Sequence, residues 1–301
     1  MKDYLLVMRV KSWLPLTAAV LCAACSASTA ESQNGVIATL PIARDAPLSI
    51  YLSARLNGGE TQRWVLDSGA SECIVDRSTA HRARLVTRGG RGLTGAGRGT
   101  VRFDSIRSPV RLEISGHALP TCDHFGAVDL THATGDSDHP IGGILGYEFF
   151  ARYVVRIDFA AHSVTLYDPK RYRYSGSGDT LELQFVKQHP RIQVRIHTAN
   201  RAEVTRSLIV DTGSEDFVDD STVRRNPAAH GVTVSTTGLG KSYEALIGTL
   251  DTVRIGRSTF TALPGVASDV GIVGNGIWSK FTVIFDYPHR RMILERRDED
   301  G

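Results

Sequence analysis

Two aspartates, Asp67 and Asp211, stand at equivalent places in two copies of one short motif, 144 positions apart. Each follows an apolar run, Trp64–Leu66 or Leu208–Val210, and precedes a hydroxyl residue and a glycine. The apolar run predicts a buried strand, and Asp-Ser/Thr-Gly predicts a tight turn at its end. Two carboxylates brought close together share one proton, so that one can take a proton from water while the other donates to a carbonyl. The pair therefore suits hydrolysis without a covalent intermediate.

The surroundings of the two motifs also repeat, and this repetition carries more weight than the motif itself. A single Asp-Ser/Thr-Gly is weak evidence, because turns favour these residues for local hydrogen bonding. Here an alternating apolar run precedes both motifs, a glycine-rich segment follows both, and apolar residues between two glycines come next. The repeated segments are 48–52 and 192–196, 94–98 and 237–241, and 143–146 and 271–274. The offset falls from 143 to 128 along the chain, which implies about fifteen extra residues in the first copy, and we place them in the polar stretch 131–139.

This order of segments resembles the retropepsin-like aspartic peptidases, twice over in one chain, from about Pro47 to Glu295. The resemblance implies a mainly β, bilobal aspartic-protease fold, with two β-barrel-like lobes related by a pseudo-two-fold axis and the active-site cleft between them. It also implies that Asp67 and Asp211 are the catalytic residues. Because the two units are fused, as in pepsin-like enzymes, we expect a monomer.

The same resemblance assigns supporting roles to the residues that follow each aspartate. Ser68 and Thr212 would form hydrogen bonds across the lobe interface, although ordinary turn chemistry is an equal alternative for them. Gly69 and Gly213 would let the backbone pass close beneath the carboxylates.

The position three residues after each aspartate differs between the two copies. Ser214 carries a hydroxyl that could donate to Asp211 and favour its charged form, whereas Ala70 offers Asp67 no such group. We therefore expect Asp211 to be the more acidic member of the pair.

The glycine-rich segments are candidates for flaps that cover the substrate, and plain hairpin turns are the alternative. The flap candidates are Gly95, Ala96, Gly97, Gly238, Leu239 and Gly240. Neither tip has a tyrosine like the one on the pepsin flap, which favours a retroviral-style pair of flaps.

The retroviral members also have an arginine after the second glycine motif. Here Tyr147 and Asn275 stand there, so the salt bridge of that arginine is not expected.

The N-terminal end of the chain predicts export. Basic residues precede an apolar stretch, 14–24, that is too short to span a membrane. Residues 1–25 resemble a bacterial lipoprotein signal peptide with Cys25 as the lipidation candidate, and cleavage near residue 30 to give an unlipidated product is the alternative. We expect a periplasmic protein, or an outer-membrane lipoprotein with a lipid anchor if Cys25 is lipidated.

The predicted domains are an N-terminal lobe at 36–172, a linker at 173–180 and a C-terminal lobe at 181–301.

Composition agrees with a globular enzyme and argues against several other classes. The chain has 301 residues, of which 42% are apolar, and a formal net charge of +3. Its arginines lack the interleaved aromatic residues of a nucleic-acid module, so we expect no nucleic-acid partner. His124, His132 and His139 match no metal-ligand spacing, so we expect no metal and no cofactor. For Cys73 and Cys122, a disulfide and two buried thiols both stay open.

The sequence therefore predicts an exported aspartic endopeptidase that acts on a peptide or protein substrate. The alternative is a noncatalytic periplasmic module, built on the same duplicated scaffold, that binds peptides or the cell envelope. A carrier for small apolar ligands is a weaker third reading, because it leaves the paired aspartates unexplained.

Overall fold

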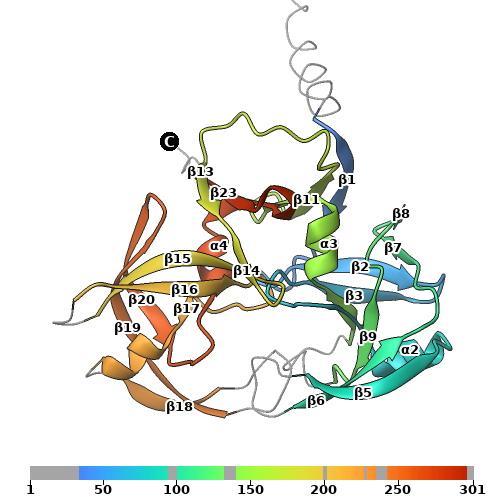
Figure 1. Cartoon of the computed structure of the whole chain (residues 1–301), viewed down its shortest axis with the longest axis horizontal. Helices are drawn as coiled ribbons and strands as arrows, with labels where there is room; N and C mark the ends of the chain where they lie inside the picture. Colours follow the sequence, from blue (N-terminus) through green and yellow to red (C-terminus); the bar gives the residue numbers. More distant parts are fainter. Residues whose placement is uncertain are drawn as a thin grey trace, which may run out of the picture.

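The structure, a computed structural model, describes residues 34–93, 100–131, 140–198, 202–226, 229–234 and 243–296. These residues form three β-sheets and a few short helices, arranged as two lobes with a third sheet across their junction (Figure 1). The predicted mainly β, bilobal fold is confirmed. Within these residues, no helix is long and apolar enough to cross a membrane.

The first lobe is built on a nine-stranded sheet. In sheet order, its strands are β5 (Thr87–Leu93), β6 (Val101–Ile106), β9 (Phe125–Val128), β4 (Cys73–Asp76), β10 (Ile141–Leu145), β3 (Thr61–Leu66), β2 (Tyr51–Leu56), β7 (Leu112–Ile114) and β8 (His117–Leu119). Every second residue of β2 is buried, as the alternating apolar pattern predicts.

The second lobe is built on an eight-stranded sheet. In order, its strands are β14 (Gln184–Val186), β15 (His189–His197), β16 (Val204–Val210), β21 (Ile272–Val273), β17 (Val218–Asp219), β20 (Ser258–Val266), β19 (Tyr243–Ile255) and β18 (His230–Val234). An additional pairing of β15 with β19 closes six of these strands into a ring.

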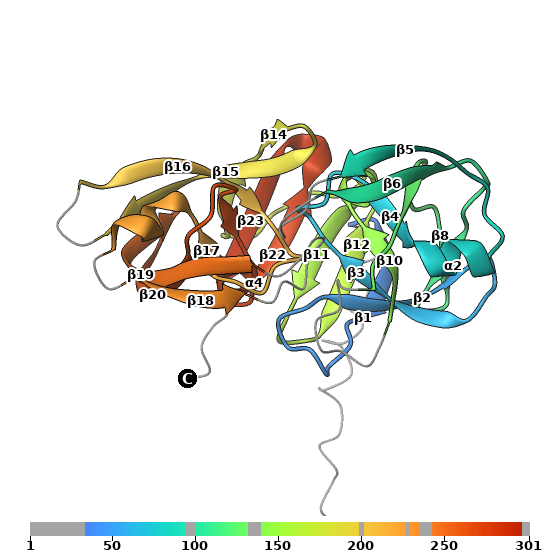
Figure 2. The same cartoon turned by 90° about the horizontal axis from the view of Figure 1, so that it is seen from below.

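A six-stranded sheet joins the two lobes, and strands from both halves of the chain contribute to it (Figures 1 and 2). In order, they are β1 (Val36–Pro41), β12 (Ser163–Tyr167), β11 (Val154–Asp158), β22 (Phe281–Asp286), β23 (Arg291–Arg296) and β13 (Asp179–Glu182). Pairing between β11 and β22 links the halves directly. The strand pairs β11–β12 and β22–β23 stand at equivalent places in the two halves of the chain. The exact domain limits at 36–172, 173–180 and 181–301 stay predictions.

Short helices connect the sheets. They are α2 (Arg77–Arg82), α3 (Tyr147–Arg152), α4 (Asn275–Trp278) and the 3-10 helices η1 (Ser221–Arg225) and η2 (Tyr287–His289). The carboxylate of Asp76 accepts a hydrogen bond from the Thr79 N–H and so caps the N-terminus of α2. Helices α3 and α4 lie between the six-stranded sheet and the lobes (Figure 1).

The two motifs in which apolar residues stand between glycines, 143–146 and 271–274, allow close packing. A Cβ on Gly143 would lie 2.3 Å from both the Trp64 ring and the Ile74 carbonyl oxygen. A Cβ on Gly146 would lie 2.4 Å from the Glu72 carbonyl oxygen. Only glycine lets these strands pass beneath the indole and beneath the turn that follows Asp67.

A disulfide joins Cys73 at the start of β4 to Cys122, with 6.4 Å between their Cα atoms. Both residues are buried. The disulfide thus settles the alternative that the sequence left open, and it fixes the strand after the Asp67 turn to the segment that leads into β9.

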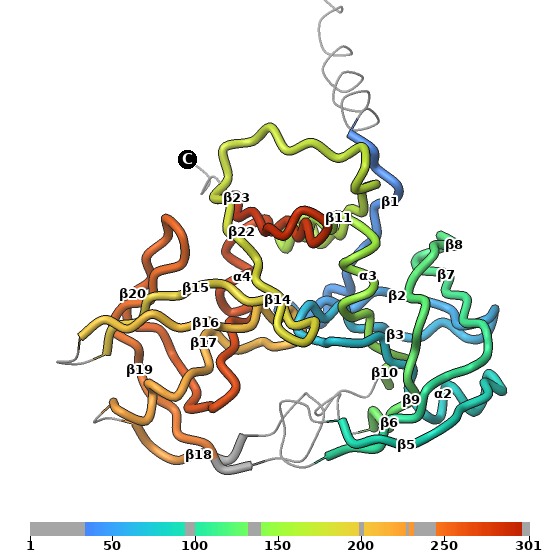
Figure 3. The backbone as a smooth tube through the Cα atoms, viewed as in Figure 1, coloured from blue at the N-terminus to red at the C-terminus, as the bar shows by residue number. Residues whose placement is uncertain are grey.

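Two hairpins, β5–β6 and β18–β19, lie on the side of the molecule away from the six-stranded sheet (Figure 3). The flap candidates, residues 95–97 and 238–240, fall in sequence between the two strands of these hairpins and lie outside the described residues.

Candidate active site

Two equivalent strand ends deliver the paired aspartates. Strand β3 runs parallel to β10, and the Asp67 N–H donates to the Leu145 carbonyl at 3.0 Å. In the second lobe, β16 runs parallel to β21, and the Asp211 N–H donates to the Val273 carbonyl at 3.0 Å. Each aspartate is therefore held at the end of a strand that its glycine motif supports.

Ser68 and Thr212 tie the two turns together through four hydrogen bonds. The Ser68 hydroxyl donates to the Val210 carbonyl at 2.8 Å and accepts from the Thr212 N–H at 3.0 Å. Conversely, the Thr212 hydroxyl donates to the Leu66 carbonyl at 2.8 Å and accepts from the Ser68 N–H at 2.9 Å. Both side chains are buried, so these bonds are shielded from water. The reciprocal pattern sets the separation of the turns.

Each turn glycine lies under the carboxylate of the other lobe. A Cβ built on Gly69 would lie 2.5 Å from Asp211 Cγ, and one built on Gly213 would lie 2.5 Å from Asp67 Cγ. Any side chain at these positions would push the opposite carboxylate away. The two glycines therefore allow the close approach of the turns that brings the aspartates together.

The two carboxyl groups interact directly and are electrostatically unequal. Burial raises the pKa of Asp67 well above its ordinary value, and the charge on Asp211 raises it further. Burial also raises the pKa of Asp211, but a hydrogen bond from Asp67 and another from the Gly213 N–H, at 2.8 Å, oppose this. These opposing effects favour Asp67 as the carrier of a shared proton and Asp211 as the ionised member of the pair.

The predicted cause of this asymmetry was wrong. The Ser214 hydroxyl contacts Asp216, accepting from its N–H at 3.2 Å and lying 3.5 Å from its Oδ2, and does not donate to Asp211. The groups that lower the pKa of Asp211 are instead Asp67, the backbone N–H groups of Gly213 and Ser214, and a residue that the sequence did not suggest, His189.

His189 lies beside the dyad although it belongs to the hairpin β14–β15. Its Nδ1 is 2.6 Å from the Gly69 carbonyl oxygen, so Nδ1 must carry a proton and donate. Its charge lowers the pKa of Asp211. No repeated motif marks this position, because the contact forms only when the second lobe packs on the turn of the first.

Asn275 directly follows the second glycine motif, 271–274. Its Nδ2 donates to the Leu48 carbonyl at 2.6 Å and to the Thr212 carbonyl at 2.8 Å. These bonds connect the second-lobe turn to the first lobe. On the other side, the Tyr287 hydroxyl donates to the Ser68 carbonyl at 3.2 Å. Both turns are therefore held by hydrogen bonds between uncharged groups, and no ion pair is needed for this contact.

Other candidate residues lie elsewhere. Cys25, His132 and His139 fall outside the described residues, as do the six flap candidates. His124 is exposed and lies 3.0 Å from the carboxylate of Glu148. Within the described parts of the chain, no group of three or more potential metal ligands is present.

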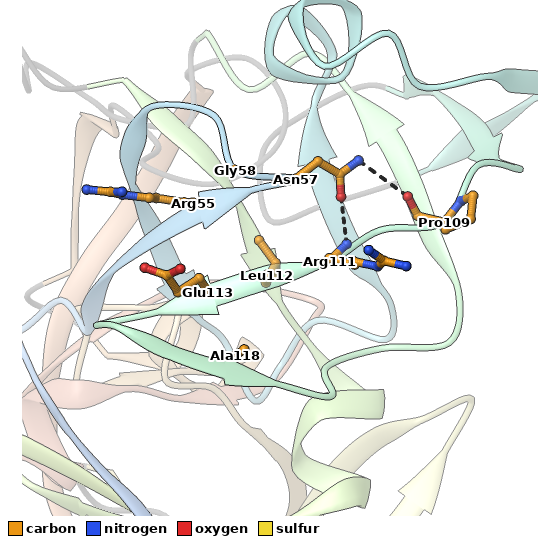
Figure 4. A pocket seen from close by; sticks show the side chains of 8 residues that line it. All are labelled: Arg55, Asn57, Gly58, Pro109, Arg111, Leu112, Glu113 and Ala118. Atoms are coloured by element: carbon orange, nitrogen blue, oxygen red, sulfur yellow. Dashed lines mark hydrogen bonds between the residues drawn. The ribbon is translucent and has the colours of Figure 1, made fainter.

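A separate hollow of about 520 Å³ lies over β2, β7 and β8 of the first lobe (Figure 4). Its lining residues are Arg55, Asn57, Gly58, Pro109, Arg111, Leu112, Glu113 and Ala118. The Asn57 carboxamide accepts from the Arg111 N–H at 2.8 Å and donates to the Pro109 carbonyl at 3.4 Å. Both ends of this amide therefore stabilise the loop, and neither aspartate of the dyad lines the hollow.

Comparison with known families agrees with this geometry. Residues 52–149 match the family model described as aspartyl protease. The matched segment contains Asp67 and supports a retropepsin-like aspartyl protease, a family that implies a peptide or protein substrate. No curated protein matches the chain.

Proposed function

We propose that the protein is an aspartic-type endopeptidase in which Asp67 and Asp211 together activate water. The observation that carries this proposal is the reciprocal packing of the two turns, in which each glycine lies under the opposite carboxylate. The shared proton and the unequal pKa values of the carboxylates give the site one acid and one base. The family match of the first lobe supports the same chemistry.

In the proposed reaction, each carboxyl group accepts one proton and donates one proton. Ionised Asp211 takes a proton from water as the water oxygen attacks the peptide carbonyl carbon, and Asp67 donates its proton to the carbonyl oxygen. In the second step, the proton on Asp211 passes to the amide nitrogen and the C–N bond breaks. The proton on the new hydroxyl returns to Asp67. Water and peptide are thereby converted into a carboxylic acid and an amine, and the dyad is restored.

The test is cleavage of a diverse peptide library by the mature protein and by the Asp67→Asn and Asp211→Asn variants. Each variant keeps the shape of the side chain but removes one titratable group, so we expect both to lose the same cuts by a factor of about 1,000 or more in kcat/KM. Circular dichroism and the unfolding midpoint establish that the variants are folded. If the folded wild type cuts no peptide but binds them, the noncatalytic peptide-binding module replaces this proposal.

We further propose that the protein acts outside the cytoplasm, with residues 1–25 as its export signal. The disulfide supports an oxidising compartment. Cell fractionation and the intact mass of the mature protein test this proposal. A mass that includes a lipid on Cys25, lost in Cys25→Ser, would indicate the lipoprotein form, and a mass starting near residue 31 would indicate the unlipidated form.

A further inference from the structure

Strand pairing shows that Asp219 takes the place of an apolar residue in the first lobe. In the first lobe, Ile144 of β10 lies between Val65 and Ile74. In the second lobe, Ile272 of β21 lies between Ile209 and Asp219 in the same arrangement. In each lobe these three paired residues form a row across neighbouring strands. The third residue of the row is Ile74 in the first lobe and Asp219 in the second.

The face of the sheet on which Ile74 lies borders the active-site turn. Ile74 belongs to a small apolar cluster that is separate from the main core. Ala70, three residues after Asp67, packs against this cluster, as do Leu93 and Val101 at the ends of the hairpin β5–β6. Ile74 thus belongs to a cluster that contacts both the turn that carries the aspartate and the strand ends next to the tip of the hairpin. A side chain at the equivalent place in the second lobe borders the Asp211 turn.

Asp219 carries a buried carboxyl group, and one of its oxygens has no hydrogen-bond partner. It is only 7% exposed, and its Oδ1 is fully buried without a hydrogen-bond partner. Val218, the preceding residue, packs into the main core, so the alternation of the strand turns Asp219 toward the opposite face. A buried carboxyl without a donor costs free energy, which a ligand that donates hydrogen bonds would recover.

The charged groups around Asp219 are acidic. Asp211 and Asp216 both act on it, and with burial they raise the pKa of Asp219 to about 8. Within the described parts of the chain, no basic side chain forms an ion pair with Asp216 or Asp219, and Arg206 forms its ion pair with Asp220.

The first lobe treats its equivalent carboxylate differently. Glu72 stands at the place of Asp216, since the carbonyl oxygens of these two residues contact Gly146 and Gly274 in the same way. Glu72 forms an ion pair with Arg91. Negative charge beside the dyad is therefore balanced in the first lobe and left unbalanced in the second.

We propose that Asp219 makes the second-lobe side of the active site selective for a basic side chain of the substrate, an arginine or a lysine. The proposal rests on the peptidase function proposed above. A guanidinium or ammonium group can donate to the unpartnered Oδ1, ionise Asp219 and offset the charge of Asp216. On the first-lobe side, the apolar row that ends in Ile74 offers no such partner, so one basic residue on one side of the scissile bond is expected.

The experiment compares peptides that differ at one position only, with arginine in one member and citrulline in the other. Citrulline keeps the shape of arginine without its charge. Such pairs are made for three positions on each side of the cleaved bond. We expect the wild type to prefer arginine by about tenfold or more in kcat/KM at one of these positions. In Asp219→Asn, the ratio of kcat/KM for the arginine peptide to kcat/KM for the citrulline peptide should fall to about twofold or less.

A matched control is Asp216→Asn, which removes the exposed neighbouring carboxylate and should leave most of the preference in place. Equal unfolding midpoints at pH 5 for the wild type and Asp219→Asn would show that the fold is unchanged. Cleavage without an arginine preference, or a preference that survives in Asp219→Asn, would overturn this inference and leave the peptidase proposal standing. A changed pH profile in Asp219→Asn with an unchanged preference would also overturn it.

Failure of the peptidase proposal would be recognised separately. If the folded wild type cleaves neither member of any pair, the same labelled peptides are titrated in a fluorescence anisotropy measurement. Tighter binding of the arginine peptide to the wild type than to Asp219→Asn would then support the basic selectivity of the site in a noncatalytic binder. Equal binding would reject it.

Discussion

At the scale of single residues, the pair of aspartates depends on two positions that have no side chain, Gly69 and Gly213. The opposite carboxylate occupies the space where their Cβ atoms would be. The shared proton exists only because the two carboxyl groups come this close. The close approach of the two carboxyl groups therefore requires that both positions lack a side chain.

This leads to a prediction for Gly69→Ala. The new Cβ would lie 2.5 Å from Asp211 Cγ, well inside contact distance, so the carboxylate must move. A displacement of this kind costs on the order of 100-fold in kcat/KM. Gly231→Ala is the matched control, because a Cβ there meets nothing within 4 Å. Steady-state kinetics on both variants, with their unfolding midpoints, check the prediction. Full activity in Gly69→Ala would contradict the described packing.

His189 provides a second prediction, on pH dependence. The groups that act on the dyad are Asp216, Asp219, Tyr287 and His189, and among them His189 favours the ionised form of Asp211. In His189→Gln, which keeps a donor for the Gly69 carbonyl but lacks the charge, the pKa of Asp211 should rise. Activity requires ionised Asp211, so the acid limb of the kcat/KM profile should move to higher pH.

The control for this prediction is His197→Gln, a histidine on the same strand at the far end of β15. Its profile should match the wild type. An acid limb that stays in place in His189→Gln, or moves to lower pH, would show that His189 acts only through its hydrogen bond to Gly69.

At the scale of elements, the sequence predicted those strands and turns that depend on the pattern of neighbouring residues. The strands before both aspartates and the turns that follow them are visible in the sequence because alternation and turn chemistry are properties of neighbouring residues. The packing role of Gly143 and Gly271 also follows from apolar residues between glycines. The pairing of β11 with β22 was not predicted, because contacts between distant strands leave no periodic signal.

Asp219 illustrates the limit of the repeat. The sequence offset of 144 aligns Asp219 with Val75, a core residue. Strand pairing instead aligns it with Ile74, because the second lobe takes one more residue between its turn and β17. A shift of one residue moves a strand side chain to the other face of the sheet. A repeat read from sequence alone therefore assigns this carboxyl to the wrong face.

The disulfide yields a prediction about an element, the strand β4. It closes a loop between residues 49 positions apart, so it restricts the unfolded chain substantially. Replacing both cysteines in Cys73→Ser/Cys122→Ser should lower the free energy of unfolding by about 3–4 kcal/mol, measured by urea denaturation. Reduction of the wild type should have a similar effect and should not change the double variant. Equal stability of the oxidised wild type and the variant would indicate that packing alone holds β4.

At the scale of the whole molecule, the shared sheet explains how one chain supplies a two-lobed site. Strands β1, β11 and β12 from the first half pair with β22, β23 and β13 from the second through the single junction β11–β22. The turns are joined again by the Ser68 and Thr212 hydrogen bonds. Two separate sets of contacts therefore fix the relation of the lobes within one chain.

This architecture predicts that two inactive variants cannot rescue each other. Asp67→Asn and Asp211→Asn each keep one intact aspartate, and in an enzyme that assembles its dyad from two chains, mixing them would restore some active sites. Here both aspartates come from one chain, so the mixture should stay inactive and the rate of the wild type should rise linearly with protein concentration. Recovery of activity on mixing, or a rate that rises with the square of concentration, would mean that lobes are exchanged between chains. Because the β11–β22 pairing and the reciprocal hydrogen bonds both form within the chain, we expect neither.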